Sequence, residues 1–307
     1  MKISIIGAGN VGSLTAMRLA QEGLGEIALI DIAKGLAQGK AYDMDDARGI
    51  LKINYNISGT DDIAMVDNSD IIVIAAGLAR KPGMSREELL NKNAGILKGI
   101  SLSIKKLSPE AIVIVVTNPL DLMTYFVLKV TGFESGKVFG MGGSLDAARF
   151  SNLISRELNV PNSDIEACVI GSHGEGMLPL ARFTNVKGRK LNELMDDKRI
   201  DELLNKTVSR GAQIVSLLGS GSAFLAPSAA IAEIVKAIAK DEKRTLAVSS
   251  YLFGEYGIKD VCIGVPVLLG KSGIERIIEL DLNKAEKERL ANSAQVISGL
   301  IKQLPLN

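Results

Sequence analysis

The single histidine of this chain, His173, is the side chain best suited to proton transfer near neutral pH. It follows an apolar run that ends at Gly171, and Gly174 comes directly after it. Imidazole has an unperturbed pKa of roughly 6.5, so it can take up or release a proton at physiological pH. A lone histidine is about as often a residue without catalytic consequence. The position at a predicted strand end, among small residues, favours a general acid or base.

A second group of residues predicts a nucleotide site. The run GAGNVG near the N-terminus matches G-x-G-x-x-G, and it follows a predicted strand and opens a predicted helix, which is the context the pattern needs. Gly7 permits a tight turn, Gly9 lets the backbone approach a diphosphate, and Gly12 lets helix and strand pack closely. Asn10 and Val11 begin the helix, whose N–H groups and dipole attract phosphate.

An acidic residue predicts which dinucleotide binds. Asp31 closes the second predicted strand, about 20 residues after Gly12. A carboxylate there accepts hydrogen bonds from ribose hydroxyls and repels a 2′-phosphate, which favours NAD over NADP. Lys34 lies three residues further on and softens that repulsion, so some use of NADP stays open. A structural glycine turn with a capping aspartate is the simpler alternative.

The elements that must position these residues fall into two regions. In the first, short apolar runs alternate with helical patterns, which predicts a parallel sheet covered by helices on both faces. The runs are 2–6, 26–30, 70–75 and 111–116, and a helix is expected at 86–107.

The second region has a different pattern. We expect a helix at 147–158, a long helical region at 198–241 that is interrupted near Gly219 and Pro227, and a last helix at 284–303. Three β runs with turns between them, at 245–253, 261–269 and 274–280, indicate antiparallel pairing. The sequence therefore predicts an α/β protein with a Rossmann doubly wound parallel sheet and a C-terminal α+β substrate domain. The expected division is 1–145 for dinucleotide binding and 146–307 for the substrate, with a cleft between them.

Composition excludes several classes of protein. The 307 residues carry 36 basic and 35 acidic side chains, a net charge of +1, so no bulk charge attracts nucleic acid or an anionic membrane. The apolar runs are too short to cross a bilayer, and the N-terminus runs straight into a strand instead of a secretory signal. Two cysteines and one histidine do not make a disulfide framework or a metal cluster. We expect a cytoplasmic protein without a bound metal.

Three further runs resemble the lactate/malate dehydrogenase family: TNPLD at 117–121, LDAARF at 145–150 and GSHG at 171–174, in the family's order and at similar spacing. The run GLARKPGMSR at 77–86 resembles the family's substrate-covering loop. The similarity extends over the whole chain and, within the family, is closest to the lactate-dehydrogenase-like malate dehydrogenases. It implies NAD-dependent oxidation of a 2-hydroxy acid by a homodimer or homotetramer.

The resemblance assigns roles to three residues that the reaction needs. His173 would take the hydroxyl proton while hydride leaves C2, and Asp146 would hold the other ring nitrogen. Arg149 lies three residues after Asp146, so a helix puts both near one face, and its planar fork suits a carboxylate. Taken singly, Asp146 is also a candidate helix N-cap, and Arg149 a surface ion pair.

The remaining site residues rest on the resemblance alone. Arg86 would polarise the C2 oxygen after loop closure, and Asn118 would bond to the substrate or the nicotinamide ribose. Thr117 and Asn93 would belong to the cofactor site. Loss of one donor to the reacting oxygen should cost on the order of 3 kcal/mol in the transition state.

Arg80 aligns with the position that decides the substrate in this family, where lactate enzymes carry glutamine and malate enzymes arginine. Malate and oxaloacetate have a second carboxylate that a guanidinium can pair with, whereas pyruvate would leave that cation unpaired. Lost pairing of this kind discriminates by ~10⁴ or more. Ala223 aligns less securely with a bulkier residue of lactate enzymes, and it would leave room for the larger substrate. The resemblance therefore implies malate and oxaloacetate as substrates, and a place in the tricarboxylic acid cycle.

Three alternatives remain. A lactate dehydrogenase is disfavoured by Arg80 and is distinguished by an assay with pyruvate. An NAD-dependent glycosidase would need a metal held by cysteine and histidine, and would lose activity with EDTA. A non-catalytic NAD-binding module would bind NADH tightly and turn over no 2-oxo acid.

Overall fold

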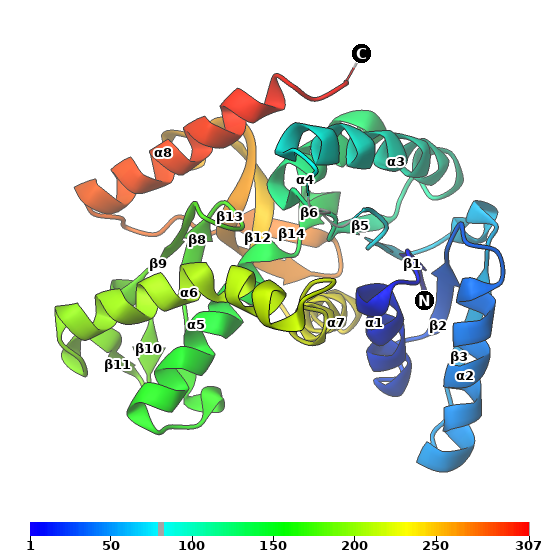
Figure 1. The fold of residues 1–307 in the computed structure, drawn as a ribbon, viewed down its shortest axis with the longest axis horizontal. Helices are drawn as coiled ribbons and strands as arrows, with labels where there is room; N and C mark the ends of the chain where they lie inside the picture. Colours follow the sequence, from blue (N-terminus) through cyan, green and yellow to red (C-terminus); the bar gives the residue numbers. More distant parts are fainter. Residues whose placement is uncertain (79–82, 307) are drawn as a thin grey trace.

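The computed structural model describes residues 1–78 and 83–306. Within them, one sheet of 11 strands passes through both halves of the molecule (Figure 1). Its first part has the order β3-β2-β1-β4-β5-β6, and all neighbours in it are parallel. The strands are β1 (Lys2–Ile6), β2 (Glu26–Ile30), β3 (Asn56–Thr60), β4 (Ile71–Ile74), β5 (Ile112–Val115) and β6 (Val138–Gly140). The order reverses between β1 and β4, where open α/β sheets bind ligands beyond the carboxyl ends of their strands.

Helices cover both faces of these strands. They are α1 (Asn10–Gln21), α2 (Leu36–Leu51), α3 (Arg86–Leu107) and α4 (Leu120–Thr131). In Figure 1, α3 and α4 lie together on one side of the sheet and α1 lies on the other. Helix α7, from the second half of the chain, packs directly against α1. The two halves therefore interlock.

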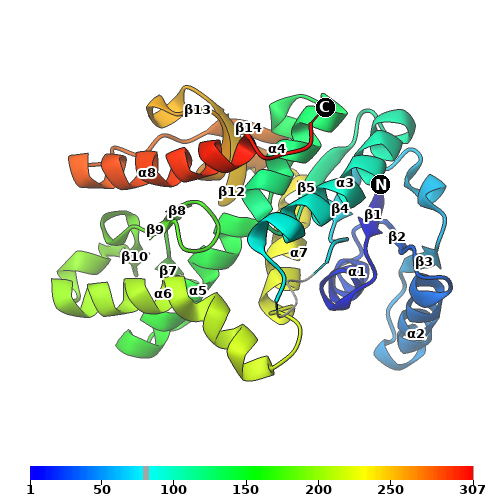
Figure 2. The same cartoon turned by 45° about the horizontal axis from the view of Figure 1, so that its top comes forward.

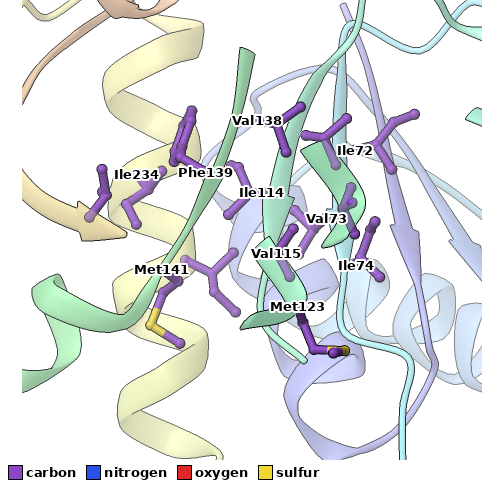
Figure 3. Packing of buried hydrophobic residues seen from close by; sticks show 14 of the residues in the cluster. Ile72, Val73, Ile74, Ile114, Val115, Met123, Val138, Phe139, Met141 and Ile234 are labelled. Atoms are coloured by element: carbon purple, nitrogen blue, oxygen red, sulfur yellow. The ribbon is translucent and has the colours of Figure 1, made fainter. Parts of the chain in front are cut away.

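The core explains the continuous apolar runs. Every residue of β4 and of β5 is buried, because helices cover both faces of these strands. Figure 3 shows Val73 and Val115 from these strands, Phe139 from β6, Met123 from α4 and Ile234 from α7 within this core.

The second half extends the same sheet with antiparallel strands, in the order β6-β12-β13-β8-β9, with β14 on β13. Three short strands, β7, β10 and β11, form a separate small sheet. The strands are β7 (Ile165–Glu166), β8 (Val169–Gly171), β9 (Met177–Pro179), β10 (Asn185–Val186), β11 (Arg189–Lys190), β12 (Arg244–Phe253), β13 (Lys259–Gly270) and β14 (Gly273–Ile277). The helices are α5 (Gly142–Leu158), α6 (Asp197–Leu218), α7 (Leu225–Ala239) and α8 (Lys284–Ile301). Figure 2 shows α5, α6 and the small sheet at the end of the molecule away from α2.

The α/β class and the antiparallel C-terminal strands are confirmed, and three elements have the expected bounds: β1, β2 and α3. Two parallel strands escaped the sequence analysis. In β3 only Ile57 is buried, because this strand lies at the sheet edge, and β6 has three residues. Both lack a long apolar run.

The expected start of helix 147–158 was wrong. Helix α5 begins five residues earlier, at Gly142. A Cβ on Gly142 would lie 2.8 Å from the Cβ of His173, and a Cβ on Gly143 would lie 2.8 Å from that of Ala247. The two glycines therefore permit close packing of this helix end, where sequence patterns favour a break.

The helices of the described residues include none that is both long and apolar enough to cross a membrane.

Candidate active site

The glycine turn between β1 and α1 combines two glycines that the fold requires with one that leaves open space. Gly7 has φ of +106°, and a Cβ there would lie 2.5 Å from the backbone nitrogen of Ala76. A Cβ on Gly12 would lie 1.9 Å from the Gly7 carbonyl oxygen. A Cβ on Gly9 would meet nothing within 4 Å. The open side of Gly9, at the first turn of α1, fits a diphosphate that approaches backbone N–H groups.

Ala8, between the first two glycines, is held by side chains on both of its backbone groups. Its N–H donates to Asp31 Oδ2 at 2.6 Å. Its carbonyl oxygen accepts from Lys40 Nζ at 2.6 Å and from Ser13 Oγ at 3.0 Å. The other Asp31 oxygen accepts from the N–H of Ala33 at 2.9 Å. Asp31 therefore lies against the turn, as a carboxylate that binds an adenosine ribose must.

Lys40 was not anticipated by the sequence analysis. It is half-buried in α2, and its ammonium group adds a positive charge beside the phosphate turn. Its only signal in the sequence is a cation in the helix that follows Asp31, and surface helices carry many such cations.

Asn10 is exposed as the first residue of α1, and Val11 lines the pocket described below. Asn93 does not line that pocket; it is fully buried and joins two backbone segments that do. Its side chain accepts from the N–H of Leu78 at 2.8 Å and donates to the carbonyl oxygen of Asn118 at 2.7 Å. Thr117 Oγ1 donates to a backbone carbonyl at 2.6 Å, and both Thr117 and Asn118 line the pocket.

A capping box starts helix α3 and so places Arg86 at its first position. Ser85 Oγ accepts from the N–H of Glu88, and the Glu88 carboxylate accepts from the N–H of Ser85, each at 3.0 Å. This reciprocal pair satisfies two backbone donors that a helix start would otherwise leave open. Arg80 lies outside the described residues.

The reacting side chains come together on the second half of the chain. Asp146 Oδ2 lies 2.8 Å from His173 Nδ1, and Asp146 Oδ1 lies 3.3 Å from Arg149 Nη1. The Asp146 side chain is 2% exposed, whereas those of His173 and Arg149 are 15% and 12% exposed. Asp146 is the fifth residue of α5, so its interpretation as a helix N-cap was wrong.

The electrostatics of this group favour a protonated histidine. Burial disfavours the imidazolium, but the charge of Asp146, its hydrogen bond and the charge of Asp121 outweigh that effect, so the pKa of His173 is raised. Burial also lowers the pKa of Arg149, against the opposing effect of Asp146, although arginine stays charged.

Among the described residues, one polar atom of the site lacks a partner. Arg149 Nε is buried and makes no hydrogen bond to any of them. An unpaired donor of a guanidinium is costly to bury, so a ligand that accepts from it is favoured. Gly211 on α6 makes room for this side chain, since a Cβ there would lie 3.3 Å from Arg149 Nη1.

A pocket of about 530 Å³ joins the two groups of residues. Val11, Asn118, Arg149, His173 and Ala223 are among its lining residues, so both halves contribute, as the predicted cleft requires.

Asp121 is the second residue that the sequence analysis missed. It ends the TNPLD run, in which the resemblance assigns it no role. The residue is 5% exposed, and its carboxylate accepts from the backbone N–H of His173 at 2.8 Å. Only the tertiary structure brings the start of α4 to the end of β8.

A glycine turn that opens a helix at one end of this pocket and a histidine held by a buried carboxylate at the other are typical of nicotinamide-dependent dehydrogenases. The chain belongs to the lactate/malate dehydrogenase family. The family's NAD-binding domain matches residues 1–140, and its alpha/beta C-terminal domain matches residues 143–304. NAD is therefore the cofactor. The described residues hold no group of three or more His, Cys, Asp or Glu side chains that could bind a metal ion.

Relatives of known identity extend over the whole chain. The chain is 50% identical over 306 residues to a malate dehydrogenase of Methanosarcina mazei, covering 100% of both proteins. The malate dehydrogenase structure from Aeropyrum pernix matches with a TM-score of 0.95 and 41% identity, covering 99% of this chain and 98% of that one. A lactate dehydrogenase from Cryptosporidium parvum, complexed with lactic acid and nicotinamide adenine dinucleotide, also has a TM-score of 0.95. It is 36% identical and covers 99% of this chain and 97% of its own.

Proposed function

We propose that this protein is an NAD-dependent malate dehydrogenase, which interconverts (S)-malate and NAD with oxaloacetate and NADH. The observation that carries the chemistry is the buried contact of Asp146 with His173 Nδ1 at 2.8 Å. His173 lines a pocket that Val11 of the GAGNVG run also lines. The 50% identity to a malate dehydrogenase supports the substrate.

Asp146 determines which nitrogen of His173 reacts. Because the carboxylate accepts from Nδ1–H, the neutral ring leaves Nε2 free to accept a proton. In malate oxidation, Nε2 takes the hydroxyl proton, the C2–O bond becomes a carbonyl, and C2 releases its hydride. NAD supplies the hydride acceptor. In the reverse direction the imidazolium, stabilised by Asp146, returns the proton to the oxygen as hydride arrives at C2.

The substrate carboxylate next to C2 fits Arg149. Its Nε, which has no partner among the described residues, and its fork of donors can bind a carboxylate in a bidentate manner, which lysine cannot reproduce. Asp146 holds Nη1 from the same helix, and so the guanidinium is oriented before the substrate binds.

Arg86, Arg80 and Asn118 complete the proposed substrate site. Arg86, at the start of α3, would polarise the C2 oxygen, and Asn118 would bond to the substrate or the nicotinamide ribose. Arg80 would pair with the second carboxylate of oxaloacetate. The proposed cofactor residues are Gly7, Gly9, Asn10, Val11, Gly12, Asp31, Asn93, Thr117 and Asn118.

The test compares oxaloacetate and pyruvate in the oxidation of NADH at 340 nm, with the parent protein and Arg80→Gln. We expect the parent to prefer oxaloacetate by ~10⁴ or more, and the variant to lose much of that preference. A parent that prefers pyruvate would make the protein a lactate dehydrogenase. An unchanged preference in Arg80→Gln would remove Arg80 from the specificity role.

We also propose the division into residues 1–145 and 146–307, a cytoplasmic location and a homodimer or homotetramer. Strongly exposed apolar side chains on helices support an assembly, among them Ile50 on α2 at 84% and Leu217 on α6 at 80%. Analytical ultracentrifugation distinguishes these states from a monomer.

A further inference from the structure

The end of β8, where His173 lies, is held by side chains from two helices. Backbone pairing of β8 with β13 and β9 ends at Gly171. The next N–H, of Ser172, donates to Ser293 Oγ on α8 at 3.1 Å. The N–H of His173 donates to Asp121 Oδ2 on α4 at 2.8 Å. The two contacts are similar in geometry, but one acceptor is neutral and the other is a carboxylate.

Asp121 is itself fixed from a third element. Its other oxygen, Oδ1, accepts from Ser249 Oγ on β12 at 2.6 Å. Both carboxylate oxygens are therefore hydrogen-bonded although the residue is 5% exposed. A buried carboxylate is costly to maintain, and a hydroxyl or amide side chain would satisfy the same two donors at a lower cost. This suggests that its charge has a function.

The charges of the site show what that function is. With a neutral His173, the buried set of Asp121, Asp146 and Arg149 carries a net charge of −1. Protonation of His173 brings the set to zero. Without the charge of Asp121, the same protonation would raise the net charge from zero to +1, which burial disfavours. Asp146 alone cannot balance both cations, since it contacts Arg149 and His173 together.

We propose that Asp121 is a positioning residue for the reaction: it fixes the backbone of His173 and, as a second buried carboxylate, favours the protonated imidazole that gives its proton to the C2 oxygen when NADH reduces oxaloacetate. The reaction direction in this statement rests on the proposed function. The effect on the histidine does not.

The pKa shift of His173 has the direction that the proposal requires, because the charge of Asp121 raises it. Burial raises the pKa of Asp121 to about 6, against the lowering effects of the Ser249 hydroxyl and of the charge and N–H of His173. The groups that face Asp121 are His173, Asp146 on α5 and the Cys262 thiol on β13. Near pH 7, Asp121 is therefore largely ionised. The pKa of His173 is raised, and the charge of Asp121 is one of the causes.

The chain's single histidine permits a direct test. In untagged protein with ¹³C-labelled histidine, the one imidazole Cε1–H resonance reports the pKa of His173 without assignment. Asp121→Asn keeps an acceptor for the His173 N–H and can donate to Ser249, but removes the charge. Ser293→Ala, the matched control, removes the neighbouring hydrogen bond without a change of charge.

We expect the pKa of His173 to be roughly one pH unit lower in Asp121→Asn than in the parent, and unchanged in Ser293→Ala. The loss of oxaloacetate reduction at high pH should move to lower pH by the same amount. An equal pKa in Asp121→Asn and the parent would overturn the proposal, as would equal shifts in both variants.

A second variant covers the case in which Asp121→Asn does not fold, which NADH fluorescence would reveal. Ser249→Ala removes a hydrogen bond from the carboxylate, which makes Asp121 harder to ionise, and we expect a smaller shift of the His173 pKa in the same direction. A higher or unchanged pKa would contradict the proposal. If the pKa falls as expected but the parent does not reduce oxaloacetate, the inference stands and the proposed function fails.

Discussion

The two halves of this protein prepare their sites with different parts of the chain. In the nucleotide half, the proposed diphosphate site is made of backbone, and the side chains of Asp31 and Lys40 hold that backbone in place. In the other half, the ligand-facing groups are side chains, and backbone packing at Gly142 and Gly211 makes room for them. In the proposed roles, a diphosphate binds to a turn of the backbone, whereas proton transfer needs a titratable side chain whose neighbours set its pKa. Substitutions should therefore separate cofactor binding from turnover.

The largest separation is expected for His173→Asn. Loss of the general acid and base should reduce turnover of oxaloacetate by roughly 10³- to 10⁴-fold, while the affinity for NADH changes by less than about twofold. Stopped-flow or steady-state NADH oxidation measures the first, and an NADH fluorescence titration measures the second. Retained turnover would remove His173 from the acid–base role, and lost NADH binding would show that the halves are not separable.

The glycine turn offers a matched pair, Gly12→Ala and Gly9→Ala. A Cβ on Gly12 would lie 1.9 Å from the Gly7 carbonyl oxygen, so the turn must shift. We expect Gly12→Ala to lower the free energy of unfolding by about 3 kcal/mol and to lose NADH binding as well. A Cβ on Gly9 meets no protein atom, so Gly9→Ala should keep its stability within about 0.5 kcal/mol.

Gly9→Ala should nevertheless weaken NADH binding by about tenfold, because the methyl group occupies the space that the diphosphate needs. Urea unfolding and fluorescence titration of both variants make the comparison. If Gly9→Ala binds NADH like the parent, the open side of the turn is not where the diphosphate lies.

Arg149→Lys tests the substrate side alone. The substitution keeps the charge and loses the fork, and we expect kcat/KM for oxaloacetate to fall by about 10²-fold, which corresponds to about 3 kcal/mol, with NADH affinity unchanged. Arg210→Lys on α6, whose charge acts on Arg149 from the neighbouring helix, is the control and should have little effect. Similar losses in both variants would show that the effect is not specific to the guanidinium of Arg149, and would remove Arg149 from the carboxylate-binding role.

The smallest effect is expected for Lys40→Met. Loss of the ammonium beside Ala8 should raise KM for NADH by about fivefold, or about 1 kcal/mol, and the difference from the parent should shrink as salt screens the charge. Ser13→Ala removes the neutral donor to the same carbonyl oxygen, so its effect should not depend on salt. A salt-independent effect of Lys40→Met would reduce Lys40 to a structural contact.

Local sequence was sufficient to predict much of the fold and most of the residues of the candidate site. The glycine spacing of residues 7–12, the carboxylate of Asp31 and the fully apolar β4 and β5 each follow from a local rule on turns, helix termini or burial. The family's motifs named His173, Asp146 and Arg149, and the structure brings these three together.

The errors occurred where distant contacts override local preference. Gly142 was expected to lie before the helix, but it is the first residue of α5. A side chain at this position would come too close to His173, which is 31 residues away in sequence, and local sequence does not show that contact. Because the helix was expected to begin at residue 147, Asp146 was interpreted as its N-cap. The edge strand β3 was missed because an edge strand needs no apolar run.

The sequence by itself determined the chemical groups present and the local backbone that holds the phosphate turn, because turns and helix starts depend on a few adjacent residues. Only the tertiary structure decided how the histidine is charged. Asp146 and Asp121 bond to His173, and Ser293 bonds to its neighbour Ser172. Ser249 holds Asp121, so four separate elements take part. A side chain's pKa depends on burial and on charges within a few ångströms, and these distances exist only once the chain has folded.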